Sequence, residues 1–468
     1  MQDKLEEILL LENISDTGKE LLRELLSTQK EKKITENTSD GYHTFKELYE
    51  YRLLYNAGMF NTLYLSQGMY GVPKAKVYKD YREMLEKEHK HIDACSVSTP
   101  DHMHAVQAMA AMQLKKHVYV QKPMAHDIYE ARVMTKAAHD YNVVTQMGNQ
   151  GSSGDGVRVL QDWYNAGLIG DVHTIYCYTD RPVWPQGVIR PATANEIPKE
   201  LDFNLWLGTA PEKSYFTDLL PFNWRGWWDY GTGALGDMAC HIMAPAFAVL
   251  GLGYPVAAEC SVATRYTAPW QRVYSPDSPP ASSHIILTFK GPNGKPDVKL
   301  HWMDGGIQPE RPAELGPNEM MGDGGNGVIF EGTKGKMMAG TYGVNPQLLP
   351  TNLTATTKVP QTVDRVKGGA EGHYSAWVEA CIAGPGSKEA KTLSSHFDIA
   401  GPLTESVLMG NLAIRSYDYK GTDSKGLTTY PGRNIQLIWD GPNMKITNFE
   451  PANQFVKRTY RAGWSLGV

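Results

Sequence analysis

The stretch IDACSVSTPDHMHAVQAMAAMQLKKHVYVQKP, residues 92–123, decides the fold. It begins with a short apolar run at 92–99, continues with an Ala- and Met-rich helical stretch at 101–116, and ends with a second apolar run at 117–121. After a further helical stretch, the apolar run 143–149 repeats the pattern. Short apolar strands that alternate with helices of 12–16 residues are typical of a parallel sheet covered by helices. We therefore predict an α/β domain with helices on both faces of the sheet.

The chain changes in character after Gly148, where the glycine content rises. Apolar runs at 283–291, 298–305 and 327–340 predict strands of an open antiparallel sheet in an α+β domain, and 397–417 predicts its last helix. The predicted division is residues 1–66, with helical patterning; 67–150, the parallel-sheet domain; 151–428, the α+β substrate and oligomerisation domain; and 429–468, an irregular tail.

Composition excludes several classes of protein. The 468 residues include 46 Lys and Arg and 51 Asp and Glu, for a formal charge of -5, which offers no footprint for nucleic acid or an anionic membrane. Five cysteines without a C-x-x-C pair predict neither a disulfide framework nor a cysteine zinc site. The longest uncharged segment, 242–258, is short and interrupted by Pro and Gly. The opening MQDKLEEILLLEN lacks the pattern of a secretory signal, which predicts a cytoplasmic protein.

Two strand ends carry polar residues suited to a ligand. Ser98, Thr99 and Pro100 lie where a predicted strand turns into a helix, and the free N–H groups of a helix start can bind an anion. The alternative is an ordinary capped helix with Pro in its first turn. Lys122 ends the next strand, where its ammonium group could polarise a substrate oxygen or exchange a proton; the alternative is a surface lysine in a loop.

A third candidate is the pair Asp237 and His241 in the segment DYGTGALGDMACHIM. Residues four apart share one face of a helix, so a carboxylate could orient an imidazole that acts as general base near neutral pH. The alternative is a structural hydrogen bond. His102 and His104 are two apart and diverge on a helix, so we predict no metal site there.

Taken in this order and spacing, these segments resemble the Gfo/Idh/MocA family, named after glucose–fructose oxidoreductase and inositol dehydrogenase. STPDHMHA (98–105) resembles the family's turn over the cofactor, and QKP (121–123) resembles its E-K-P motif, with Gln in place of Glu. Likeness continues in MGNQG, GTGALGDMACH, HYSAWVEA and AGPLTESVLMGN, and covers roughly residues 67–468. The nearest likeness is to long, sugar-active members.

The resemblance implies a Rossmann-type domain that binds NAD or NADP, hydride transfer to or from a sugar or glycoside hydroxyl, and a homo-oligomer. It implies that Lys122, Asp237 and His241 border the reacting hydroxyl. The cofactor-binding residues that it implies are Ser98, Thr99, Pro100, His104, Gln121, Lys122, Asn149 and Gln150. Ala244 stands where the family often has an aspartate.

The amino-terminal part departs from the family, which starts with a strand, a Gly-rich turn, a helix and a second strand. Nothing in residues 1–66 fits that unit. The formal G-x-G-x-x-G matches at 231–236 and 322–327 lack the strand-turn-helix context and are rejected. Residues 1–66 weakly resemble a small phage protein, so we predict foreign sequence in place of the first β-α-β unit; the alternative is a divergent amino terminus. We accordingly expect weak or undetectable NAD binding.

Two other functions remain open on this reasoning. The first is an NAD-dependent glycosidase, in which the cofactor oxidises a ring carbon, the glycosidic bond breaks by elimination, and the cofactor is reduced and reoxidised without net change. The second is an inactive or binding-only fusion chain, which the missing nucleotide fingerprint favours. Net formation of reduced cofactor separates the oxidoreductase from the glycosidase.

Overall fold

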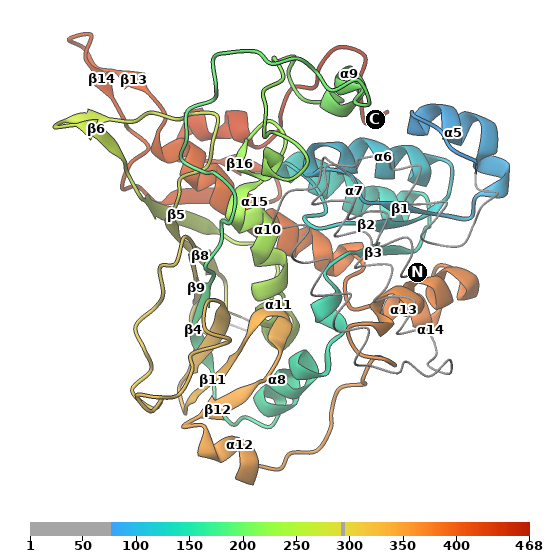
Figure 1. The fold of residues 1–468 in the computed structure, drawn as a ribbon. Helices are drawn as coiled ribbons and strands as arrows, with labels where there is room; N and C mark the ends of the chain where they lie inside the picture. Colours follow the sequence, from blue (N-terminus) through green and yellow to red (C-terminus); the bar gives the residue numbers. More distant parts are fainter. Residues whose placement is uncertain (1–75, 292–294) are drawn as a thin grey trace, which may run out of the picture.

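The computed structural model describes residues 76–291 and 295–468 (Figure 1). The interpretation of residues 1–66 as a helical, foreign segment concerns residues outside the described part. Within that part, a small parallel sheet and a large mixed sheet lie on either side of helix α15 (Phe397–Tyr417), which contacts both. Its bounds are those that the sequence predicts. The division of the chain at 66, 150 and 428 stays a prediction.

The predicted alternation of strands and helices is confirmed. Strands β1 (Ala94–Val97), β2 (His117–Val120) and β3 (Thr145–Met147) pair in parallel in that order. Helices α6 (Asp101–Gln113) and α7 (Ile128–Asp140) connect them. Helix α5 (Tyr81–Glu88) and the 3-10 turn η1 (His89–His91) precede β1.

The two faces of the parallel sheet are covered by helices from distant parts of the chain. Figure 1 shows α6 and α7 on one side and α13 (Gly372–Ala383) on the other. Tyr119 of β2 meets Trp377 of α13 edge to face, with ring centroids 5.5 Å apart. A helix from the carboxyl-terminal half of the chain therefore covers the face of the parallel sheet that α6 and α7 do not cover.

The large sheet has nine strands in the order β12-β11-β10-β4-β9-β8-β5-β15-β16. All neighbours are antiparallel except β4 and β9, which corrects the expectation of a purely antiparallel sheet. More than a hundred residues separate these two strands, which is ample length for a parallel crossover. The strands are β4 (Val172–Tyr178), β5 (Ala257–Val262), β8 (Ser283–Phe289), β9 (Val298–Met303), β10 (Gly327–Gly332), β11 (Lys336–Ala339), β12 (Gln347–Leu349), β15 (Leu437–Asp440) and β16 (Lys445–Ile446).

The carboxyl-terminal tail is not the irregular segment that the sequence predicts. β15 pairs with β5 and β16 because Leu437 and Trp439 alternate as buried residues along it. Further along, Arg458 binds Glu130 of α7 at 2.6 Å, and the main-chain oxygen of Leu466 accepts a hydrogen bond from Gln113 of α6. The tail thus connects the large sheet to the helices α6 and α7 that cover the parallel sheet.

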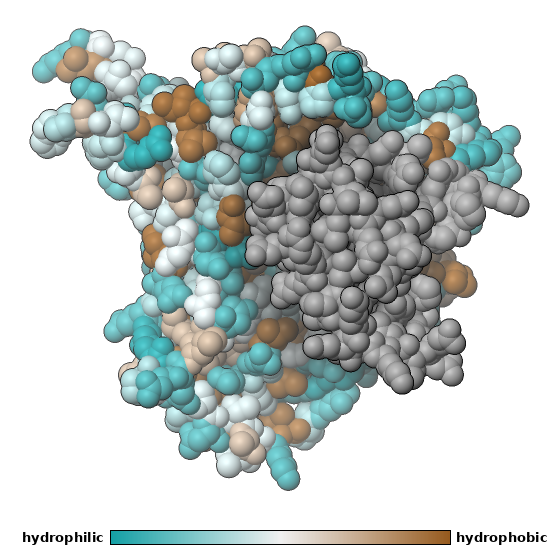
Figure 2. Space-filling model, viewed as in Figure 1, coloured by the Kyte–Doolittle hydropathy of each residue, from teal (hydrophilic) through white to brown (hydrophobic). Residues whose placement is uncertain are grey.

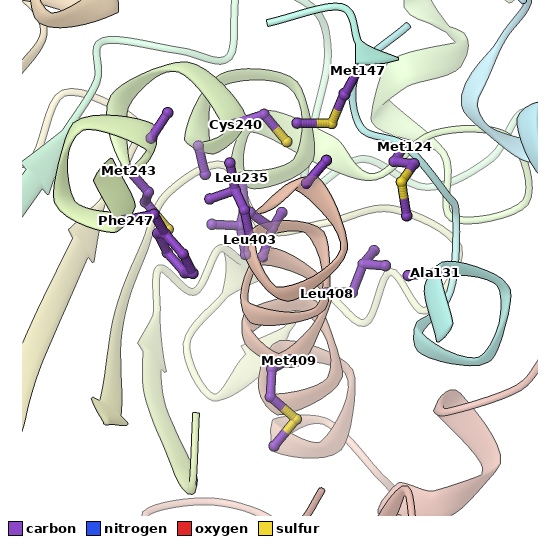
Figure 3. Packing of buried hydrophobic residues seen from close by; sticks show 14 of the residues in the cluster. Met124, Ala131, Met147, Leu235, Cys240, Met243, Phe247, Leu403, Leu408 and Met409 are labelled. Atoms are coloured by element: carbon purple, nitrogen blue, oxygen red, sulfur yellow. The ribbon is translucent and has the colours of Figure 1, made fainter. Parts of the chain in front are cut away.

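Helix α15 is the centre of the core, and most of its residues are buried (Figure 3). It packs against α10 (Gly233–Ile242), whose continuation is α11 (Ala244–Leu250). A Cβ atom at Gly410 would lie 2.6 Å from a methyl carbon of Leu235, so glycine permits the close approach of α15 and α10. Helix α10, which carries two predicted site residues, is therefore held on a rigid support.

The remaining elements are η2 (Gln150–Ser153), α8 (Asp155–Asn165), α9 (Phe203–Leu207), η3 (Asn223–Gly226), β6 (Tyr266–Ala268), β7 (Gln271–Arg272), η5 (Thr341–Gly343), α12 (Asn352–Thr356), α14 (Lys388–Lys391), β13 (Gly421–Thr422), β14 (Thr428–Thr429) and η6 (Glu450–Phe455). On the face in Figure 2, hydrophobic residues of the described part lie in small groups among hydrophilic ones. In residues 76–291 and 295–468, no single helix is long and apolar enough to cross a membrane, whereas the bent pair α10–α11 passes by length and composition.

Candidate active site

Lys122 lies directly beyond the carboxyl end of β2 and reaches across to α10. Its Nζ donates hydrogen bonds to Oδ1 of Asp237 at 2.8 Å and to the main-chain oxygen of the same residue at 2.7 Å. Both side chains are 18% exposed. The ion pair joins the parallel sheet to the second domain, and this excludes the alternative of a free surface lysine.

The carboxylate of Asp237 also faces Arg225, whose Nε lies 3.3 Å from Oδ1. Burial alone would raise the pKa of Asp237, but Lys122 and Arg225 outweigh it and lower that pKa to about 2. The guanidinium of Arg225 lies 4.3 Å from the ring centroid of Trp224. Sequence reasoning missed Arg225, because no spacing rule links a loop residue to a helix that begins eight residues later.

His241 follows Asp237 by one helical turn, as predicted, but the two side chains do not bond each other in the described part of the chain. Asp237 uses its carboxylate on Lys122 and Arg225 instead. The Nδ1 atom of His241 is buried and has no hydrogen-bond partner among the described residues. Burial, reinforced by the positive charge of Lys122, lowers the pKa of His241 to about 3. The imidazole is therefore neutral at physiological pH.

Tyr342 packs against His241 and is a further residue of the candidate site that sequence reasoning missed. Its ring meets the His241 ring edge to face, with centroids 4.7 Å apart. Its φ angle is 63°, in the left-handed region that non-glycine residues rarely adopt and that is often found at functional sites. A Cβ at Gly151 would lie 2.5 Å from the Cβ of Tyr342, so the two backbones are in close contact. No pattern in the sequence announces this turn.

Asn149 links the end of β3 to the same helix. Its Nδ2 donates to the main-chain oxygen of Cys240 at 3.1 Å and to Oγ of Ser152 at 2.8 Å. Its Oδ1 is buried without a hydrogen-bond partner in the part of the chain described. Gln150 starts η2 and is partly exposed. Two strand ends, at Lys122 and Asn149, thus converge on α10.

The end of β1 carries the predicted anion-binding turn. Pro100 is the N-cap residue of α6, and Ser98 is exposed beside it with its Oγ 3.3 Å from that of Ser96. Thr99 donates its hydroxyl to Gln107 within the turn. Ser98 remains exposed at this helix start, so its side chain is accessible to a ligand.

His104 connects the turns that follow β1 and β2. Its Nδ1 lies 2.8 Å from the oxygen of Pro123, and its Nε2 lies 2.7 Å from the oxygen of Thr99. Both nitrogens are engaged, so His104 positions the turns. Gln121 lies against Gly148, where a Cβ would approach its Oε1 to 2.7 Å. The assignment of both residues to the cofactor stays a prediction.

These residues suit a nicotinamide dinucleotide. In the first turn of α6 the N–H groups of His102 and Met103 already donate to the main-chain oxygens of Tyr230 and Pro100, so the exposed Ser98 is the group beside this helix start that a pyrophosphate can reach. The buried Oδ1 of Asn149 is an acceptor that still lacks a donor among the described residues. The motif at 231–236 follows the 3-10 turn η3 rather than a strand of the parallel sheet, which supports its rejection as a fingerprint. Within the described residues, no group of three His, Cys, Asp or Glu side chains is arranged to hold a metal ion.

Comparison with known proteins agrees with this architecture. Residues 66–149 match the NAD-binding Rossmann-fold domain of the oxidoreductase family Gfo/Idh/MocA, and residues 175–274 match its carboxyl-terminal alpha/beta domain. Both of these regions are thus similar to domains of the Gfo/Idh/MocA oxidoreductase family. The first match contains the three strands of the parallel sheet, and the second contains most of β4 and the whole of β5 in the mixed sheet.

Similar proteins in the Gfo/Idh/MocA family include two curated relatives. An uncharacterized oxidoreductase of Streptococcus pneumoniae is 31% identical over 112 residues, which are 24% of this chain and 29% of the relative. The levoglucosan dehydrogenase of Pseudarthrobacter phenanthrenivorans is 25% identical over 173 residues, 37% of this chain and 36% of the relative. The matched region thus spans about a third of these relatives. A solved levoglucosan dehydrogenase complex with NADH and levoglucosan has a TM-score of 0.44 at 16% identity, covering 72% of this chain and 82% of that chain.

Proposed function

We propose that this chain is an NAD(P)-dependent oxidoreductase that transfers hydride between the nicotinamide and a hydroxyl-bearing carbon of a sugar or glycoside. The observation that carries the proposal is the Lys122–Asp237 ion pair beside the neutral His241, at the carboxyl ends of parallel strands. Curated relatives named levoglucosan dehydrogenase and 1,5-anhydro-D-fructose reductase support a sugar as the substrate class.

Lys122 would hold the reacting oxygen. Its ammonium is fixed by two hydrogen bonds to Asp237, and the third N–H is available to a substrate hydroxyl or carbonyl. As the hydroxyl loses its proton, the same N–H stabilises the developing negative charge without moving. Asp237 keeps the ammonium in place, because its depressed pKa leaves it ionised at neutral pH.

His241 would accept the hydroxyl proton. The lowered pKa keeps the ring neutral, so it has a free site for a proton, but it also makes the ring a weak base; the transfer therefore depends on Lys122 lowering the pKa of the bound hydroxyl. In the reverse direction, the ring returns the proton to the alkoxide oxygen as the carbonyl is reduced. A bound nicotinamide supplies the hydride acceptor or donor. Ser98, Thr99 and Asn149 are the residues proposed to hold it.

A direct assay tests the proposal. The purified chain is incubated with NAD⁺ or NADP⁺ and a panel of neutral sugars and glycosides, and net formation of reduced nicotinamide is followed by absorbance. Net reduced cofactor is the expected result and also separates NAD from NADP. Glycoside cleavage without net reduced cofactor would contradict it in favour of the oxidation–elimination glycosidase, which no observation in the structure favours.

Cofactor affinity is a separate question, because residues 1–66 do not match the family's first strand, Gly-rich turn and helix. We expect the loss of those N–H contacts to cost about 4 kcal/mol, or roughly a thousandfold in affinity. Calorimetry with NAD⁺ on the intact chain measures this directly. A dissociation constant in the low micromolar range would show that the expected impairment is wrong. We also propose a homo-oligomer, which sedimentation of the same sample tests.

A further inference from the structure

A second cavity lies away from the Lys122–Asp237 site, at the carboxyl-terminal end of α15. Its volume is about 530 Å³, within the range of about 300–1,000 Å³ typical of small-molecule sites. The end of β5, the stem of the β6–β7 hairpin, the last turn of α15 and η6 enclose it, and none of the three predicted catalytic residues lines it. The cavity therefore does not belong to the site already described.

Positive charge dominates the walls of this cavity. The charged side chains that line it are four cations and one carboxylate: Arg265, Arg272, Arg415, Lys420 and Asp418. The carboxylate of Asp418 is already bonded to two arginines. Arg272 binds both of its oxygens, at 2.7 and 3.0 Å, and Arg433 binds one of them at 3.0 Å. Among the described residues, Asp418 therefore forms no ion pair with the other three cations of the wall, although its charge still acts on Lys420.

Arg415 is the cation of this wall that a bound anion would stabilise most. Its guanidinium lies 4.2 Å from the ring centroid of Phe455 and 5.6 Å from that of Trp228. The charges of Asp229 and Asp127 act on it only from a distance, since these carboxylates pair with Lys213 and Arg458, and among the described residues none forms an ion pair with Arg415. Burial lowers the pKa of Arg415 to about 10, so the group is partly desolvated yet charged at neutral pH. A desolvated cation of this kind gains most from a charge-assisted hydrogen bond.

Aromatic rings complete the cavity. Trp228, Phe455, Tyr274 and Tyr419 line it together with the cations, and Lys420 stacks over Tyr274 with its Nζ 3.5 Å from the ring centroid. Such walls offer flat apolar surface beside positive charge. They match a small ring compound that carries one anionic group.

We propose that this cavity binds a small ring molecule bearing a carboxylate or phosphate, with the oxyanion on Arg415 and the ring against the aromatic side chains. Arg265, which is exposed at the rim, adds attraction for the same anion. The two sources of the oxyanion, a sugar acid and a sugar phosphate, share this chemistry, and the test separates them.

The test is calorimetric titration of the intact chain with D-glucuronate and with glucose 6-phosphate, and with D-glucose as the neutral probe. We expect at least one anion to bind, and D-glucose not to bind at this cavity. Arg415→Met should weaken that binding by about tenfold or more, as expected for a lost hydrogen bond to a charged group. Lys290→Met is the matched control. Lys290 is exposed, directly follows β8 and pairs with Asp297, so this variant should bind the anion as tightly as the parent does.

Two further variants serve as a replacement for Arg415→Met and as a control for the Lys122–Asp237 site. If Arg415→Met does not fold, Arg265→Met replaces it, because that side chain is exposed, and a weaker affinity is still expected. Asp237→Asn should bind the anion as the parent does, since Asp237 lies outside the cavity. The proposal is overturned if neither anion binds, if Arg415→Met weakens D-glucose binding as much as anion binding, if the folded arginine variants bind unchanged, or if Asp237→Asn abolishes anion binding.

Discussion

Lys122 and Arg415 are two partly buried cations in different surroundings. Lys122 has a carboxylate and a carbonyl oxygen within 2.8 Å, whereas Arg415 lies between two aromatic rings and has no anionic partner in the described part of the chain. Desolvation of a charge is costly unless a partner compensates it. A cation that is already paired serves to position its N–H groups, whereas one that is unpaired offers a place for an anion that arrives from outside.

The largest effect is expected at Lys122. Lys122→Ala should lower turnover by about 10²–10⁴-fold, the usual contribution of a general acid–base group, while substrate affinity changes much less. Steady-state kinetics measure both. Lys136→Ala, at an exposed lysine paired with Asp140, is the control and should keep the parent's turnover. A turnover of Lys122→Ala within threefold of the parent would show that the ion pair is structural.

Arg458 provides a paired cation without a proposed catalytic role. Its guanidinium binds Glu130, which is 1% exposed, and it also lies near Asp127. Arg458→Met leaves the buried Glu130 without a cation among the described residues, and only hydrogen bonds from Tyr460 and two main-chain N–H groups remain. We therefore expect the free energy of unfolding to fall by about 3 kcal/mol. Urea denaturation measures it. A loss below about 1 kcal/mol would mean that water compensates the carboxylates.

His102 is a third case of a buried basic side chain, and it is neutral rather than paired with an anion. Burial, with repulsion from Arg458, lowers its pKa to about 3, below the value of about 6.5 expected in the unfolded chain. Between these two pH values the unfolded state binds a proton that the folded state does not, so stability falls as the pH falls. From pH 7 to pH 5, His102→Gln should lose about 2 kcal/mol less stability than the parent. His173→Gln, at an exposed histidine, should follow the parent.

Arg415 should give the smallest effect on stability. The two carboxylates whose charges act on Arg415, Asp229 and Asp127, keep their own cations Lys213 and Arg458, so Arg415→Met should change the free energy of unfolding by less than about 1 kcal/mol. The contrast with Arg458→Met is the direct test of the comparison. If both variants lose the same stability, Arg415 depends on a partner that the described residues do not include.

Much of the site follows from sequence because its parts are local. A strand followed by Lys122, and a helix with Asp237 and His241 four residues apart, are patterns within short windows. The partner of each side chain is not local: Lys122 and Asp237 are 115 residues apart. Arg225 and Tyr342 come from loops whose course only tertiary packing determines. The lowered pKa of His241 likewise depends on burial, which the helical pattern alone does not reveal.

The contacts of the tail with α6 and α7 also bear on how the protein is made. A ribosome delivers the parallel sheet early, but Arg458 and the residues near Leu466 arrive last. Until then, Glu130 lacks its cation, and the outer surface of α6 and α7 lacks its cover. Domains that emerge first usually fold first, whereas closing contacts across more than 300 residues is slow because of the chain entropy it costs. The nascent nucleotide-binding domain therefore waits for the end of translation before it reaches its final stability.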